Sequence, residues 1–276
     1  MSTDPHTRLA EFLAVGDSTQ NLPGVVIRDA ATMMVIDRSG PAPKVLLGRR
    51  HQGHKFMPGK YVFPGGRVEG ADRRVTAATA LDSRVEARLM QEVRRPSPAK
   101  ARSFALAAIR EVFEETGLVL GTKAGTALPA MRAGMPQAPA TSLLKPDALR
   151  PGKPTDAAGS EWGRFATTGV EPDLGGVHFI ARAITPPGRP RRFDTRFFAV
   201  DAAAIAARID GVVGPDTELV ELVWLPIDAT LQLDMAGITL AVMEELKIRT
   251  AAGFGHDLAV PFYRVHRGKR LRTLLT

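Results

Sequence analysis

Three glutamates stand close together in one short stretch of this 276-residue chain, REVFEETGL from Arg110 to Leu118. Glu111, Glu114 and Glu115 share one face of a helix, because residues three and four apart on a helix are surface neighbours. Gathering like charges in this way destabilises a helix by roughly 0.2–0.5 kcal/mol per pair. We therefore expect a positive partner, and carboxylates without cysteines or paired histidines favour a hard cation such as Mg²⁺ or Mn²⁺.

Two neighbouring features support a binding site over a solvated acidic helix face, which is the simpler interpretation of the glutamates alone. Arg110 lies four residues before Glu114, close enough to hold that carboxylate in a fork-like pair. Upstream, FPGGRVEGAD (Phe63 to Asp72) contains two adjacent glycines, which let backbone approach a ligand or metal closely.

Taken together, these stretches resemble the signature of the Nudix hydrolases: glycine, five residues, glutamate, a spacer, then Arg-Glu-aliphatic-x-Glu-Glu-x-Gly-aliphatic. Gly66 takes the place of the first glycine, and REVFEETGL fills every defined place of the second half. Asp72 stands where the family usually has glutamate. In addition, 37 residues separate Asp72 from Arg110, where the family has seven. Such an insertion is tolerable because the entropy of closing a loop grows slowly with length.

The insertion narrows the resemblance to peroxisomal coenzyme A diphosphatases and their bacterial relatives. Two further stretches are similar to that subgroup. One is FMPGKYVFPGG (residues 56–66), which leads into the two-part signature, called the box from here on, and the other is RRFDTRFF (residues 191–198), which follows it. In the coenzyme A signature of such hydrolases, Leu46, Leu47, Arg50 and Gly59 fit the spacing. Lys55 replaces an arginine of that signature, and an ammonium cannot reproduce the bidentate grip of a guanidinium.

The resemblance implies metal-dependent hydrolysis of a pyrophosphate bond in a nucleoside-diphosphate derivative, a small-molecule substrate. Coenzyme A or an acyl derivative is the leading candidate. ADP-ribose, dinucleotides and nucleoside triphosphates are alternatives within the family. A non-catalytic nucleotide- or nucleic-acid-binding protein of the same fold is the alternative from another class, and the intact set of Arg110 and three glutamates argues against it.

The resemblance also assigns roles to individual residues. The Mg²⁺ or Mn²⁺ ligands would be Glu111, Glu114 and Glu115, with the backbone carbonyl of Gly65. Arg110 would orient Glu114 from behind the metal site. The general base stays open among Glu111, Glu114 and Glu218. The residues expected to contact substrate are Arg50, Lys55, Phe63, Gly66 and Arg192.

The elements that must position these residues follow from apolar runs and turn signals. Strands are predicted over residues 31–39, 43–50, 61–63, 177–185, 195–201 and 218–226. Helices are expected over 76–93 and 235–252, and a third, carrying the glutamates, is expected to be capped by Ser103 and Gly117. Strands and helices without strict alternation indicate an α+β fold, and the resemblance implies an α/β/α sandwich around a mixed sheet.

The domain organisation is predicted from the same patterns. We expect a Nudix domain over residues 23–250, with an N-terminal extension at 1–22 and a solvated basic tail at 251–276. Within the domain, residues 73–102 would form a helical insertion and residues 121–160 a long loop or lid. In RRFDTRFF, we expect three strand phenylalanines in the core and Asp194 paired with an arginine, and we expect Trp162 and Trp224 to be packing residues.

The amino-acid composition limits the classes of partner that this chain is expected to bind. Net charge is +8, in short basic clusters, and only 6% of the residues are aromatic, so a phosphate-bearing small molecule fits better than a stacked nucleic acid. The absence of cysteine excludes disulfides, thiolate zinc sites and cysteine nucleophiles. No signal pattern is present, and no apolar run reaches the roughly 18 residues that span a bilayer, which predicts a cytoplasmic protein with no membrane partner. A homodimer is left open.

Overall fold

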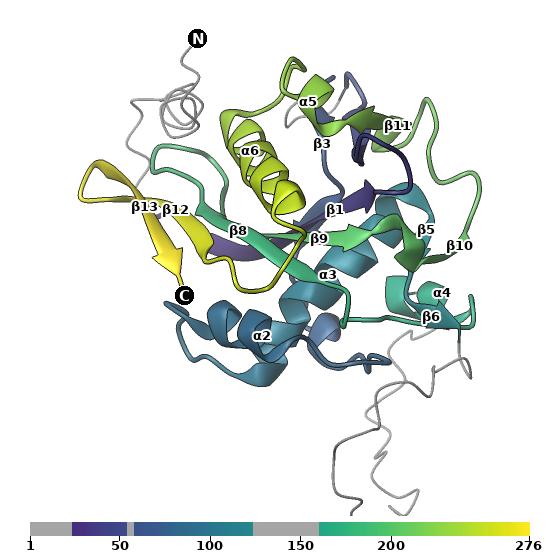
Figure 1. The fold of residues 1–276 in the computed structure, drawn as a ribbon, viewed down its shortest axis with the longest axis horizontal. Helices are drawn as coiled ribbons and strands as arrows, with labels where there is room; N and C mark the ends of the chain where they lie inside the picture. The colour runs from purple at the N-terminus through teal and green to yellow at the C-terminus, as the bar shows by residue number, and fades with distance from the viewer. Residues whose placement is uncertain (1–23, 54–57, 124–159) are drawn as a thin grey trace, which may run out of the picture.

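A nine-stranded mixed sheet forms the centre of the structure, a computed structural model that describes residues 24–53, 58–123 and 160–276 (Figure 1). Its main path is β11-β2-β1-β9-β8-β12-β13, with β3 paired to β2 and β4 to β1. The pairs β1·β9 and β12·β8 are parallel, and the other neighbours are antiparallel. The strands of this sheet are β1 (Ile27–Asp37), β2 (Lys44–Arg50), β3 (Tyr61–Val62), β4 (Gly65–Arg67), β8 (His178–Ile184), β9 (Arg192–Asp201), β11 (Leu219–Pro226), β12 (Val260–His266) and β13 (Lys269–Leu275).

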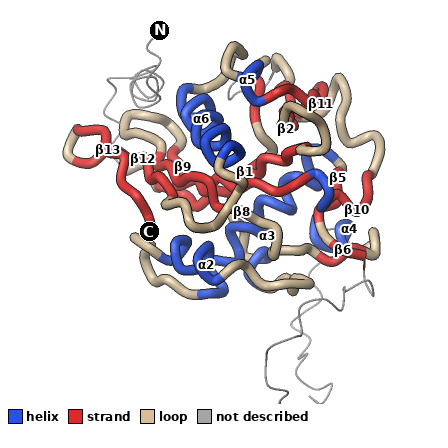
Figure 2. Tube along the Cα trace, viewed as in Figure 1, coloured by secondary structure: helices blue, strands red, loops and turns tan. Residues whose placement is uncertain are grey.

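Helices cover both faces of this sheet, as the red strands between blue helices in Figure 2 show. Met33 and Val35 of β1 belong to a core that includes α3 (Pro98–Thr116) and α2 (Ser83–Met90). Met34 and Ile36 belong to a second core with α6 (Gly237–Ala251). Because β1 is buried on both faces, its sequence is apolar at successive positions. The predicted α/β/α sandwich is confirmed.

Shorter elements complete the described part of the chain. Two small antiparallel pairs lie outside the large sheet, one of β5 with β10 and one of β6 with β7. The bounds of these elements are β5 (Leu118–Leu120), β6 (Thr122–Lys123), β7 (Val170–Glu171), β10 (Ile205–Arg208), α4 (Glu161–Ala166), α5 (Ile227–Thr230), η1 (Ala71–Arg73) and η3 (Ala202–Ala204). The predicted extension at 1–22 and most of the predicted loop at 121–160 lie outside the described residues.

The helix that carries the glutamates, α3, begins earlier than its sequence pattern predicted. Its N-cap is Ser97, whose hydroxyl accepts a hydrogen bond from the backbone N–H of Lys100 at 3.2 Å, and Pro98 follows at the first helical position. Ser103 is therefore not the cap; it is buried inside the helix and donates to the carbonyl of Lys100. A serine followed by proline starts a helix well, because proline's fixed φ suits the first turn. Gly117 ends α3 with φ of 73°, which confirms the predicted C-cap.

Between η1 and α3, the insertion contains one short α-helix, α2, and no α-helix over residues 74–82. α2 covers residues 83–90, not 76–93, because the carboxylate of Asp82 accepts a hydrogen bond from the N–H of Arg84 and caps the helix there. Before it, Thr79 bridges to Asp173 in an extended conformation. The buried Leu89 of α2 confirms part of the predicted apolar repeat.

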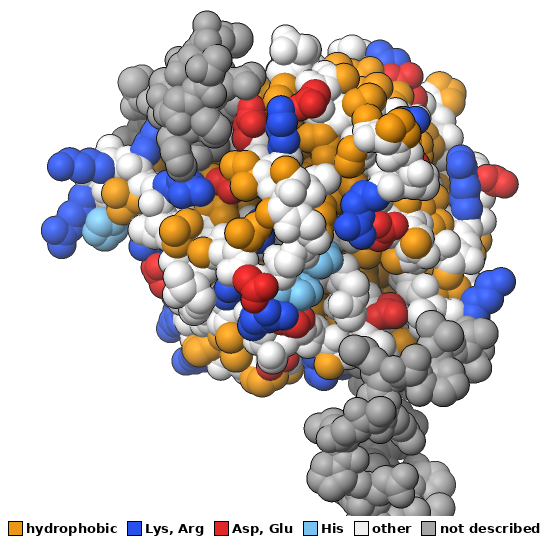
Figure 3. Space-filling model, viewed as in Figure 1, with side chains coloured by type: hydrophobic (Ala, Val, Ile, Leu, Met, Phe, Trp, Pro, Cys, Tyr) orange, Lys and Arg blue, Asp and Glu red, His pale blue; other side chains and the backbone are white. Residues whose placement is uncertain are grey.

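The C-terminal segment is a hairpin of the sheet, so the prediction of a solvated tail from residue 251 is wrong. β12 pairs in parallel with β8, and Phe262 and Leu275 are buried in the core beneath α3. The basic residues of β13, Lys269, Arg270 and Arg272, are exposed, and blue side chains project from the edge of the molecule where Figure 1 places this hairpin (Figure 3). The charge count therefore hid a strand whose last residue, Leu275, is buried in the core. No helix in the described ranges is both long enough and apolar enough to span a membrane.

Candidate active site

The C-terminal half of α3 lies beside β4, which brings the two halves of the box together. β4 pairs with β1, where Gly65 is opposite Thr32, and α3 packs across both strands. Of the 37 intervening residues, 73–97 loop out through the end of η1 and through α2, and 98–109 form the start of α3. The sheet thus rejoins two segments that the insertion separates in sequence.

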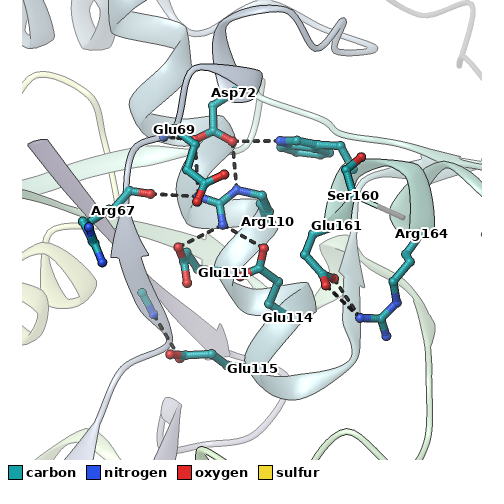
Figure 4. Close-up of polar contacts among 12 residues, drawn as sticks. Arg67, Glu69, Asp72, Arg110, Glu111, Glu114, Glu115, Ser160, Glu161 and Arg164 are labelled. Carbon is teal, nitrogen blue, oxygen red and sulfur yellow. Dashed lines mark hydrogen bonds and ion pairs between the residues drawn. The ribbon is translucent and has the colours of Figure 1, made fainter. Parts of the chain in front are cut away.

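Arg110 lies at the centre of the site, and 3% of its side chain is exposed. Its guanidinium donates to Asp72 at 2.9 Å, to Glu111 at 3.0 Å, to Glu114 at 2.8 Å and to the carbonyl of Arg67 at 2.8 Å. Figure 4 shows Arg110 between Asp72 on one side and Glu111 and Glu114 on the other. Burial alone would lower the pKa of Arg110, but the hydrogen bond to Asp72 and the charge of Glu111 raise it above its ordinary value.

Asp72 is fully buried and is held by three elements. Besides Arg110, the indole Nε1–H of Trp162 donates to it at 2.8 Å, and the backbone N–H of Glu69 donates at 2.7 Å. Trp162 lies on α4, far along the chain, and packs edge-to-face on Phe165 with ring centres 5.3 Å apart. The prediction that Trp162 only packs is therefore incomplete. No sequence signal links residues 90 positions apart.

The two glycines let backbone approach the carboxylates, as their sequence position predicted. A Cβ at Gly66 would overlap the carboxylate of Glu111, so any other residue would displace it. The backbone N–H of Gly65 donates to Glu115 at 3.2 Å. β4 thus supports Glu111 and Glu115 from the side opposite the helix backbone.

The glutamates carry more negative charge than Arg110 compensates. Burial raises the pKa of Glu111 to about 7; Arg110 opposes the shift, and the charges of Glu114 and Glu218 add to it. Burial also raises the pKa of Glu115 well above its ordinary value, with further increases from Glu218 and Glu111. Burial is again the main reason that the pKa of Glu114 is raised. Such mutual repulsion indicates a site suited to an added cation.

Arg50 and Glu218 join this cluster from the sheet edge. Arg50 ends β2, and Glu218 immediately precedes β11, which pairs with β2 through Leu219 and Arg50. Their side chains form an ion pair of 2.7 Å. Both influence the pKa of Glu115, which Arg50 lowers and Glu218 raises, so both lie near the box. The structure therefore brings these two predicted residues to the site.

The structure places two other predicted substrate contacts, Phe63 and Arg192, away from the box, and a third is not among the described residues. Lys55 lies outside the described residues. Phe63 is 5% exposed and belongs to the core under α6, because β3 and β4 turn it inward. Arg192 donates to the carbonyl of Thr185 at 3.0 Å at the start of β9. It is five residues before Phe197, the partner of Thr32 beside Gly65, which is about 16 Å of strand. The structure thus places Phe63 in the core and Arg192 away from the box glutamates, and their contacts with substrate stay predictions.

The expected ion pairs of RRFDTRFF are present. Asp194 accepts two hydrogen bonds from Arg182, at 2.8 and 2.7 Å, and lies 3.4 Å from Arg196. Phe197 and Phe198 are buried on opposite faces of β9. Phe193 is only half-buried and belongs to neither core, so the prediction is confirmed for the ion pair and for two of the three phenylalanines.

The donor set of the box suits a hard divalent cation. One oxygen of Glu111 and one of Glu114 bind Arg110, and one of Glu115 binds Gly65, while the second oxygen of each makes no hydrogen bond to the described residues. In the present side-chain arrangement, no three acidic or histidine residues of the described ranges converge closely enough to hold a metal. Carboxylates with free oxygens and raised pKa values fit Mg²⁺ or Mn²⁺ chemically.

Comparison with known proteins places this geometry in a family. No protein-family model matches the sequence. The crystal structure of a Nudix hydrolase from Alicyclobacillus acidocaldarius is similar over 83% of this chain and 97% of its own, with 26% identity and a TM-score of 0.52. This chain belongs to the Nudix hydrolase superfamily. Its two box segments are thus the halves of an interrupted Nudix box.

A curated Nudix relative gives a more specific likeness. Acyl-coenzyme A diphosphatase NUDT19 from Gallus gallus is 28% identical over 217 residues, which is 62% of this chain and 54% of the relative. The chain therefore spans about half the length of that relative.

Proposed function

We propose that this Nudix protein hydrolyses the pyrophosphate bond of a nucleoside-diphosphate derivative in a reaction that requires Mg²⁺ or Mn²⁺. One observation carries the proposal: a single buried arginine holds Asp72, Glu111 and Glu114, and leaves an excess of carboxylates with free oxygens beside it. Buried negative charge of this kind is costly unless a positive group neutralises it.

The residues of the box would have different roles in this reaction. Glu111, Glu114 and Glu115 would hold the cation, and Arg110 fixes the first two of them in place. When bound, a divalent cation supplies charge neutralisation for the diphosphate oxygens and lowers the pKa of a water. Phosphoryl transfer needs little beyond such positioning and charge stabilisation.

Substrate binding and proton transfer would use residues at the rim. Arg50 is 12% exposed in its side chain and supplies a guanidinium beside the box for a substrate phosphate. The proton acceptor must reach the attacking water, and Glu111, Glu114 and Glu218 are the candidates. Glu218 is the most open of these, with 42% of its side chain exposed.

Coenzyme A or an acyl derivative is our leading substrate, and the likeness to an acyl-coenzyme A diphosphatase supports it. Cleavage at the diphosphate would give adenosine 3′,5′-bisphosphate and a 4′-phosphopantetheine product. ADP-ribose, dinucleotides and nucleoside triphosphates carry the same diphosphate group and are the alternatives.

A substrate panel with Mg²⁺ and Mn²⁺ tests the proposal. It compares wild type, Glu114→Gln and a control, Glu86→Gln, which makes the same change on α2 away from the box. We expect turnover of coenzyme A to fall by at least about 10²-fold in Glu114→Gln and to stay unchanged in the control. Product analysis by chromatography identifies the bond that is cleaved.

The panel separates the family activity from the substrate. Turnover of ADP-ribose or triphosphates alone would remove the coenzyme A assignment and leave the hydrolase proposal intact. Equal turnover by wild type and Glu114→Gln would contradict the proposed metal site. Binding of the nucleotides without any turnover would favour the non-catalytic alternative.

A further inference from the structure

A basic hollow lies on the insertion, away from the box glutamates. Its volume is about 370 Å³, and its lining residues are Arg73, Arg94, Arg95, Ser97 and Lys100. They come from η1, from the turn after α2 and from the start of α3. Folding thus gathers four cationic side chains from three segments around one small volume.

Most of these cations have no anionic partner in the parts of the chain that the structure describes. The guanidiniums of Arg73, Arg94 and Arg95 make no hydrogen bond or ion pair there. Lys100 alone is engaged, 3.4 Å from Asp29 and 3.3 Å from the carbonyl of Arg94. Gathering like charges is unfavourable, and a planar guanidinium fork matches the oxygens of a phosphate.

The start of α3 adds to the positive potential of the hollow. Ser97 caps this helix of 19 residues, and both Ser97 and Lys100 line the hollow. The N-terminus of a helix carries a partial positive charge from its aligned peptide dipoles. This contribution adds to that of Arg73, Arg94 and Arg95, which have no anionic partner among the described residues.

We propose that this hollow, the insertion anion site, binds a phosphate group of a small molecule, separate from the diphosphate that is cleaved. Ser97 precedes Arg110 by more than three turns of α3, which is roughly 20 Å of helix. Arg73 directly follows Asp72 of the box network, so it is only at the Ser97 end of the hollow, beside Arg94, Arg95 and Lys100, that a phosphate lies too far from the box to belong to the scissile diphosphate. Because the lining contains no aromatic side chain, stacking of single-stranded nucleic acid has no platform there.

Calorimetric titration of the metal-free protein with inorganic phosphate and with inorganic pyrophosphate tests this site. The variant Arg94→Gln/Arg95→Gln removes two guanidiniums from the hollow. The control Arg267→Gln/Lys269→Gln makes the same charge change at the exposed tip of the β12–β13 hairpin, where Arg267 lies in the turn and Lys269 begins β13. We expect saturable binding at one site, at least about tenfold weaker in the first variant and unchanged in the control.

Two further measurements strengthen the test. Arg73→Gln, on η1, is expected to weaken binding independently, and thermal unfolding verifies that each variant is folded. Titration with adenosine 3′,5′-bisphosphate distinguishes a phosphate carried on a nucleotide from free phosphate: tighter binding than that of inorganic phosphate, lost in the same variants, would indicate the nucleotide.

Three results would overturn the insertion anion site. One is the absence of saturable binding to wild type. Another is equal weakening in the variant and the control, which would indicate only the net positive charge of the protein. The third is binding that increases with the length of a single-stranded RNA while phosphate does not compete. None of these results depends on whether the box hydrolyses a diphosphate.

Discussion

Two buried arginine networks pack against α3, and they balance charge in opposite ways. In the box, one arginine, Arg110, faces Asp72, Glu111 and Glu114. In the sheet, two arginines share Asp194: Arg182 donates two hydrogen bonds to it, and Arg196 lies 3.4 Å away.

The sheet network pairs its arginines with acidic residues of the protein itself. Arg196 also donates to Asp29 at 2.7 Å, and its guanidinium lies 3.8 Å from the ring centre of Phe104 on α3. Burial lowers the pKa of Arg196, and Asp194 opposes that shift. In the box, by contrast, burial raises the pKa values of Glu111 and Glu115, neighbouring carboxylates raise them further, and Arg110 and Arg50 offset these shifts only in part. The two ion-pair clusters therefore differ in charge balance, and this difference is the basis for the cation proposed at the box.

Replacing each central arginine by methionine should break the two networks to different extents. Arg110→Met leaves Asp72 buried with only neutral donors, and we expect a loss of about 3–5 kcal/mol in the free energy of unfolding. Arg196→Met leaves Arg182 on Asp194, and methionine still packs on Phe104, so we expect a loss of about 1–3 kcal/mol. Urea unfolding at pH 7.5 measures both.

The order of these two losses is the informative result. If Arg196→Met destabilised the protein as much as Arg110→Met, the sheet network would depend on its second arginine, and the contrast in charge balance would be wrong. Recovery of stability by Arg110→Met at lower pH, where the carboxylates bind protons, would support the assigned cause.

The pH dependence of stability should distinguish the networks next. The pKa of Glu111 is raised to about 7 in the folded protein, above its ordinary value of 4.5. Its effect on the metal-free protein is therefore absent below about pH 4.5 and becomes destabilising as pH rises towards 7. We expect Glu111→Gln to be more stable than wild type by about 1–3 kcal/mol at pH 7.5, with the difference vanishing near pH 4.5.

The matched control is Asp194→Asn, which should be destabilising at pH 7.5 because two arginines face that carboxylate. Differences between variants are needed because His178 titrates in the opposite sense. Burial and the charge of His256 lower its pKa to about 4, so its contribution is lost as pH falls from 6.5. Saturating Mg²⁺ should remove the advantage of Glu111→Gln, and an advantage that persists in Mg²⁺ would contradict a cation at the box.

Local chemistry explains why the box and the fold could be predicted from sequence. The spacing of Glu111, Glu114 and Glu115 on one helix and the cap at Gly117 depend on residues close in sequence. Strand runs buried on both faces, as in β1, are also visible directly. The start of α3 was misplaced because Ser97 and Ser103 are equally good capping residues, and only the following proline distinguishes them.

Contacts between distant segments explain what the sequence did not predict. Trp162 donates to Asp72 only because α4 packs beside the box, and the hairpin of β12 and β13 joins the sheet only because β8 offers a parallel edge. Phe63 and Arg192 follow family-like motifs, yet one turns into the core and the other begins a strand about 16 Å from the box. The homodimer remains a prediction.

The smallest expected effect concerns Trp162, which donates from α4 to Asp72 of the box network. Trp162→Phe keeps the ring that packs on Phe165 and removes only the donor to Asp72. We expect a loss of about 1–2 kcal/mol in the free energy of unfolding, because the acceptor is a buried carboxylate. Trp224→Phe, on the partly exposed face of β11, is the matched control and should change stability by less than about 0.5 kcal/mol.

Kinetics can separate support of the network from simple packing. Loss of the indole N–H leaves Asp72 with Arg110 and the N–H of Glu69, so Asp72 can shift and Arg110 can follow it. Because Arg110 also holds Glu111 and Glu114, we expect a higher concentration of Mn²⁺ to be needed for half-maximal turnover, by about tenfold. An unchanged Mn²⁺ requirement with lowered stability would mean that Trp162 supports the fold alone, and the box would then be independent of α4.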